Sequence, residues 1–66
     1  MSKPIEHLGI FIARRIVRGD VQAARVAFIT APRPVSWRVA ELRAIAGACR
    51  YAREQWSADV TVDQFM

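Results

Sequence analysis

The chain has 66 residues, a net charge of +4 and a hydrophobic fraction of 53%. This length leaves room for one domain, so residues 1–66 are expected to fold as a single helical unit. The apolar content excludes a chain that is disordered by composition. Cys49 is the single cysteine, which excludes an internal disulfide, and one Cys with one His cannot supply the four ligands of a structural zinc site.

The shortness of the chain limits the size of its core. A domain of this length buries only about 60% of the surface that its unfolded form exposes. Such domains usually depend on a disulfide, a metal or a partner chain. Because the first two are excluded, the sequence predicts self-association or binding to another protein.

The charge is unevenly distributed. Residues 7–53 hold nine arginines against Asp20 and Glu41, whereas residues 54–66 hold three acidic residues and no basic one. Guanidinium groups bind carboxylates and phosphates in bidentate fashion, so a basic body favours an acidic protein or a nucleic acid as partner. The alternative is that the arginines only reflect the codon usage of a GC-rich genome.

Apolar side chains recur at helical spacing through residues 5–18, which predicts the first helix. Pro4 suits its first turn, and Gly19 is expected to end it in the left-handed conformation. The residues that define the apolar stripe are Ile5, Leu8, Ile12 and Ile16. This helix is cationic and amphipathic, so an anionic membrane surface is an alternative ligand, but its narrow polar strip makes a membrane the less favoured partner.

A second helix is predicted over residues 20–30, with Asp20 as its N-cap. Residues 26–30 also have strand propensity, but the Gly-Asp junction favours a helix. Pro32 and Pro34 then require a break, because proline disfavours the helical conformation in the residue before it.

The third and longest helix is predicted over residues 36–56, with Ser36 as its N-cap. Its expected apolar stripe consists of Val39, Leu42, Ile45, Ala46, Cys49, Ala52 and Trp56. The acidic tail, residues 57–66, is compatible with a short strand or with a last helical turn capped by Thr61 and Gln64. Its end, Phe65 and Met66, either packs back on the helices or projects as a docking motif. The predicted fold is an all-α, small three-helix bundle with a short acidic C-terminal tail.

No set of residues predicts a catalytic, cofactor or metal site. His7 has no nearby nucleophile in a recognised pattern, and Cys49 is expected to be a buried small hydrophobe. Glu41 and Glu54 point to different sides of the third helix and are not an acid/base pair. Each instead follows an arginine, Arg38 or Arg50, at ion-pair spacing.

Two surfaces remain as candidate binding sites. The first is the side of the third helix where small residues lie between aromatic ones, an arrangement that suits a protein interface. Its residues are Trp37, Ala40, Ala44, Gly47, Ala48 and Tyr51. The alternative is that the first two helices cover the third and leave nothing exposed.

The second surface is basic and is a candidate for contacts to anions or nucleic acid. Arg43 and Arg50 lie seven residues apart and face the same way, with Gly47 between them. The full set of candidates is Arg14, Arg18, Arg33, Arg38, Arg43 and Arg50. The alternative is a solvated basic face that binds nothing.

The sequence therefore predicts a non-enzymatic protein–protein interaction module that modulates a larger target and self-associates, for instance as a homodimer. The alternative is a small basic DNA- or RNA-binding regulator, although two prolines and about six residues make the turn longer than in a helix-turn-helix motif. The absence of a secretory signal and of a long apolar segment predicts a cytoplasmic location.

Overall fold

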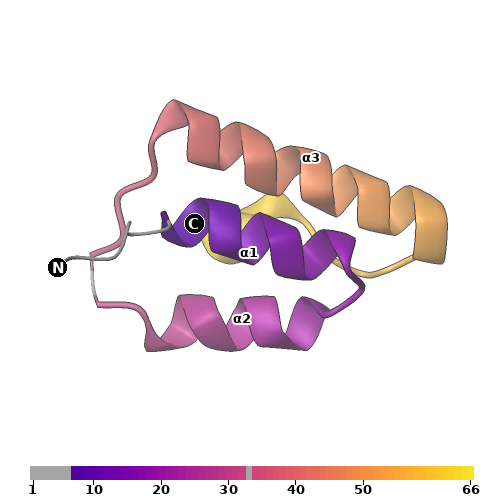
Figure 1. The fold of residues 1–66 in the computed structure, drawn as a ribbon, viewed down its shortest axis with the longest axis horizontal. Helices are drawn as coiled ribbons and strands as arrows, with labels where there is room; N and C mark the ends of the chain where they lie inside the picture. The colour runs from indigo at the N-terminus through magenta and orange to yellow at the C-terminus, as the bar shows by residue number, and fades with distance from the viewer. Residues whose placement is uncertain (1–6, 33) are drawn as a thin grey trace, which may run out of the picture.

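The computed structural model describes residues 7–32 and 34–66. It contains three helices and one 3-10 turn: α1 (Leu8–Val17), α2 (Val21–Thr30), α3 (Val39–Trp56) and η1 (Val62–Phe65). The prediction of a small all-α bundle of three helices is confirmed, and no strand occurs among the residues described. α1 packs against both α2 and α3, and η1 packs against α3 (Figure 1).

The junction between α1 and α2 has the predicted local chemistry. Gly19 has a φ of 83°, in the left-handed region, and the N–H groups of Gly19 and Asp20 donate back to the carbonyls of Ile16 and Arg15. These two hydrogen bonds form a Schellman motif, which satisfies the last carbonyls of the helix. Asp20 then caps α2, since its Oδ1 accepts from Ala23 N at 3.2 Å. The predicted start of the first helix at Pro4 and Ile5 lies outside the described residues.

The prediction that Ser36 caps the third helix is wrong. Arg38 is the N-cap and the helix begins at Val39. The carboxylate of Glu41, at the third helical position, reaches back and accepts from Arg38 N at 3.1 Å. Because an acidic side chain inside the first turn satisfies this N–H, the helix begins here without a hydroxyl cap.

Glu41 also joins α3 to α1. Its side chain is only 6% exposed, and its second oxygen, Oε2, accepts from Gly9 N in the first turn of α1 at 2.9 Å. Gly9 permits this approach because it has no Cβ: a Cβ there would lie 2.9 Å from Glu41 Cγ. The expected Arg38–Glu41 ion pair is thus replaced by bonds from two backbone N–H groups.

These contacts also decide the ionisation of Glu41. Burial disfavours the charged carboxylate, but the N–H groups of Arg38 and Gly9, with the nearby charges of His7 and Arg38, outweigh it. The pKa of Glu41 is therefore below its ordinary value. A charged group stabilises the junction of the two helices.

The buried face of α3 is rotated relative to the predicted stripe. Ile45, Cys49 and Ala52 are fully buried as expected, but Val39 is 64% exposed, Trp56 is 48% exposed and Ala46 is also exposed. The stripe was predicted from the hydrophobicity of the residues alone. In the structure, the side of α3 that is buried, and on which α1 packs, carries Glu41 and Ala48 instead. Cys49 is the predicted buried small residue, and burial raises the pKa of its thiol.

The C-terminal segment, residues 57–66, completes the core. Phe65 and Val60 are fully buried, and the ring of Phe65 meets Phe28 of α2 edge to face, with 5.6 Å between centroids. Trp37 Nε1 donates to Phe65 O at 2.6 Å. Phe65 therefore packs back on the helices, while Met66 stays exposed. The alternatives of a strand and of a projecting Phe65 are wrong.

Arginines fasten this segment to two helices. Arg25 on α2 donates to Asp59 O at 2.8 Å and to Gln64 Oε1 at 3.0 Å, and Arg53 on α3 donates to Val60 O at 3.0 Å. The C-terminal segment of the chain thus covers apolar side chains of the helices, a role that the sequence analysis predicted for a partner chain.

Candidate anion-binding groove on the outer side of α3

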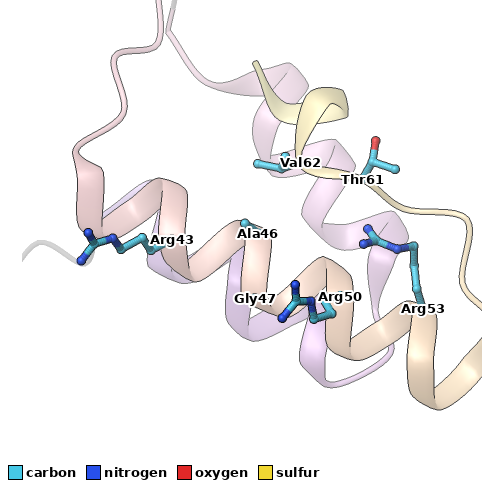
Figure 2. A pocket seen from close by; sticks show the side chains of 7 residues that line it. All are labelled: Arg43, Ala46, Gly47, Arg50, Arg53, Thr61 and Val62. Carbon is cyan, nitrogen blue, oxygen red and sulfur yellow. The ribbon is translucent and has the colours of Figure 1, made fainter.

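A groove of about 500 Å³ lies between α3 and the residues around the start of η1 (Figure 2). We call it the basic groove. It is lined by Arg43, Ala46, Gly47, Arg50, Arg53, Thr61 and Val62. Five of these seven residues come from α3 and two from the C-terminal segment, so the groove exists only because that segment packs back.

Helical spacing places the five α3 residues together. Residues three, four and seven apart in a helix share one side, so Arg43, Gly47 and Arg50 follow one another along the outer surface of α3. The bond from Arg53 to Val60 O holds the opposite wall, which carries Thr61 and Val62, beside them. The groove is therefore walled by a rigid helix and by a segment tied to that helix.

The charge of the groove is uncompensated. Within the described residues, Arg43 and Arg50 make no hydrogen bond, ion pair or ring contact. No carboxylate lines the groove. The predicted pairing of Arg50 with Glu54 is wrong, since no ion pair joins them in the described part of the chain. Two guanidinium groups are thus free to bind an anion.

The middle of the groove is open as well as basic. A Cβ added to Gly47 would meet no atom within 4 Å, in contrast to one added to Gly9. Ala46 and Val62 give the groove an apolar lining beside the charges. A ligand here can approach the helix backbone closely between Arg43 and Arg50.

The predicted small-residue interface does not form one continuous surface. Ala40, Gly47 and Tyr51 are exposed on α3, and Tyr51 is 45% exposed. Ala44 is half-buried and Ala48 is buried in the core. Trp37 is half-buried, because its ring stacks on Phe28 at 6.1 Å and its Nε1 bonds to Phe65 O. Three of the six residues are therefore available to a partner, and Gly47 is the one that also lines the basic groove.

The predicted anion contacts are dispersed over the fold. Arg43 and Arg50 line the basic groove at separate points along α3 (Figure 2). Arg14 is exposed on α1, Arg18 at the C-cap of α1 and Arg38 at the N-cap of α3. Arg33 lies outside the described residues.

Arg53 is the groove arginine that the sequence prediction omitted. It lies three residues after Arg50, the spacing that places two helical residues side by side, and this signal was present in the sequence. The second wall, with Thr61 and Val62, had no comparable signal because it depends on how the C-terminal segment packs.

A pair of aromatic rings lies near the end of α3. Tyr51 and Trp56 meet edge to face, with 5.5 Å between centroids, and each is about half exposed. Edge-to-face packing is a favourable geometry for two rings. These rings extend the exposed apolar surface of α3 beyond the groove.

In the ranges 7–32 and 34–66, no three His, Cys, Asp or Glu side chains lie together as a metal site would need. None of the helices found there has the length and apolarity needed to cross a membrane. The chain matches no protein-family model and shows no significant similarity to a curated protein or a solved structure.

Proposed function

We propose that this protein is a non-enzymatic interaction module that binds an acidic protein through the outer side of α3. The observation that carries the proposal is the uncompensated charge of the basic groove: Arg43 and Arg50 have no partner within the described residues, and Gly47 between them is open. A guanidinium group binds a carboxylate through two parallel hydrogen bonds, which gives both attraction and orientation. Modulation of a larger cytoplasmic target is the role we propose for this contact.

Exposed apolar side chains support self-association as part of the same proposal. Val39, Tyr51 and Trp56 are exposed along α3, and Ile29 of α2 is 69% exposed. Because the C-terminal segment already fills the core, a second copy is not required to close it. We therefore propose a homodimer that forms and dissociates while each chain stays folded.

Nucleic-acid binding is the second candidate. It is favoured by the arginines of α3, since Arg38 is exposed and Arg43 and Arg50 are unpaired, and unpaired arginines neutralise phosphates. The link between α2 and α3 spans residues 31–38, which is longer than the three or four residues of a helix-turn-helix turn. This candidate therefore predicts phosphate contacts without that motif.

Sedimentation separates the two candidates. The purified chain is run alone, with a glutamate-rich peptide and with random duplex DNA, each at low and at physiological salt. We expect a faster species with the acidic peptide, self-association of the chain alone, and no shift with DNA. A salt-sensitive shift with DNA alone would replace the proposed function with the nucleic-acid candidate.

The matched variants are Arg50→Gln, which removes one unpaired charge of the groove, and Arg18→Gln, which removes one charge elsewhere. Arg18 is exposed at the C-cap of α1 and is not among the residues that line the groove. Arg50→Gln should remove most of the shift with the acidic peptide, and Arg18→Gln should retain most of it. Equal losses in both would mean that net charge alone drives binding.

A further inference from the structure

We infer that the basic groove binds a short, extended acidic peptide segment with two carboxylates three residues apart. This inference rests on the proposed function, which assigns an acidic protein to α3, and adds which structure of that protein is bound. It depends on the size of the groove, the spacing of its arginines and the character of its walls.

The size of the groove favours an extended segment over a helix. Its volume of about 500 Å³ is within the range of pockets that hold small ligands. A helix with its side chains is about 10–12 Å across, so it would present only one side to the groove, whereas an extended segment is narrower. A few residues of extended chain, with side chains directed at the walls, fit the available space.

The positions of the two arginines along the helix backbone are spaced like successive turns of an extended segment. Arg43 and Arg50 are seven residues apart on α3, which is about 10.5 Å along the helix axis at about 1.5 Å per residue. A polyproline II segment has three residues per turn and rises about 3.1 Å per residue. Acidic residues at positions i and i+3 of such a segment therefore lie on one side, about 9.3 Å apart.

The walls favour a peptide over a single-stranded nucleic acid. No Phe, Tyr or Trp lines the groove, so it offers no surface on which bases stack. Ala46 and Val62 instead offer apolar contacts for a small side chain between the two acids, and the hydroxyl of Thr61 adds a polar group to the lining.

The test is a titration of the full chain with three labelled proline-rich peptides, followed by fluorescence anisotropy. The first carries glutamates at i and i+3, the second carries them at i and i+2, and the third has glutamines at i and i+3. We expect the first peptide to bind about tenfold more tightly than the second. In the second peptide the two carboxylates lie on different sides, so only one of them reaches an arginine at a time. The glutamine peptide should not bind.

The variants assign the binding to the groove. Arg43→Gln and Arg50→Gln should each weaken the first peptide about tenfold, and Arg18→Gln should weaken it less than twofold. A peptide preference that is independent of spacing, or equal losses in all three variants, would overturn the inference.

A glutamate-rich peptide that forms a helix distinguishes the two proposals. If it binds in an Arg43- and Arg50-dependent way while all three extended peptides fail, the proposed function stands and the extended segment is wrong. If no acidic peptide binds the groove, both proposals are wrong. Displacement of the bound first peptide by duplex DNA at equal charge concentration would likewise contradict selectivity for a peptide.

Discussion

The two sides of α3 differ in whether their charged side chains have hydrogen-bond partners. On the inner side, Glu41 is 6% exposed, and two backbone N–H groups donate to its carboxylate, one from Gly9 of α1 and one from Arg38 at the N-cap of α3. On the outer side, Arg43 and Arg50 are exposed and have no partner in the described chain. The inner charge stabilises the fold, whereas the outer charges contribute little to stability and remain available for binding.

The two helical glycines sharpen this comparison. Gly9 lies against Glu41, where an added Cβ has no room, and Gly47 lies in the basic groove, where an added Cβ meets nothing within 4 Å. The same substitution should therefore have opposite effects at the two positions.

The largest effect is expected for Glu41→Ala. The substitution removes the acceptor of Gly9 N–H and Arg38 N–H, and a buried donor without an acceptor costs about 1–3 kcal/mol. We expect the free energy of unfolding to fall by about 3 kcal/mol in urea titrations. Glu54→Ala is the control, because Glu54 is exposed on the same helix, and it should change stability by less than about 0.5 kcal/mol. Equal losses of stability in Glu41→Ala and Glu54→Ala would contradict the distinction between the inner and outer sides of α3.

Acidification should weaken the same contact. Because the pKa of Glu41 is lowered in the folded chain, its stabilising effect is complete above the ordinary value of 4.5 and is lost as the pH falls through the lower folded value. Urea midpoints measured from pH 6 downwards should drop in this acidic range for the wild type. Glu41→Gln should have a lower midpoint at pH 6 and a flatter profile below it. Parallel profiles would show that other carboxyls dominate the acid response.

Gly9→Ala should destabilise the fold by about 2 kcal/mol. An added methyl would overlap the side chain of Glu41 and push α1 away from α3, and overpacking of this kind costs about 1–3 kcal/mol. The loss should appear as a lower thermal midpoint. An unchanged midpoint would mean that the two helices are farther apart than described.

Gly47→Ala should have a smaller effect of the opposite sign. Glycine in a helix interior is less favourable than alanine by about 0.5–1 kcal/mol, and no neighbouring atom opposes the added methyl. The thermal midpoint should rise. A fall in the midpoint would show that the groove is occupied by part of the chain or by a second copy.

Local sequence signals were sufficient to predict much of this fold. The Gly19–Asp20 junction was predictable because its chemistry is contained within a few residues, and the three helices follow from periodicity and from the two prolines. Arg43, Gly47 and Arg50 were predictable as neighbours for the same reason, since helical spacing alone places them together.

Contacts between distant residues were not predictable in this way. The carboxylate of Glu41 bonds to a residue 32 positions away, and this contact moves the start of α3 and rotates its buried face. The packing of Phe65 on Phe28 and Trp37 likewise depends on tertiary structure. The second wall of the basic groove follows from that packing, so the sequence predicted only the wall that α3 forms.

The most direct test of binding at the outer side of α3 is NMR titration of the full chain with a glutamate-rich peptide, with the two helical glycine amides and the arginine Nε–H groups as probes. We expect concentration-dependent shifts at Gly47, Arg43 and Arg50, while Gly9, whose N–H is bonded to Glu41, stays unchanged. Shifts confined to Arg14 and Arg18 on α1, or no shifts at Gly47, would contradict the assignment of binding to the basic groove.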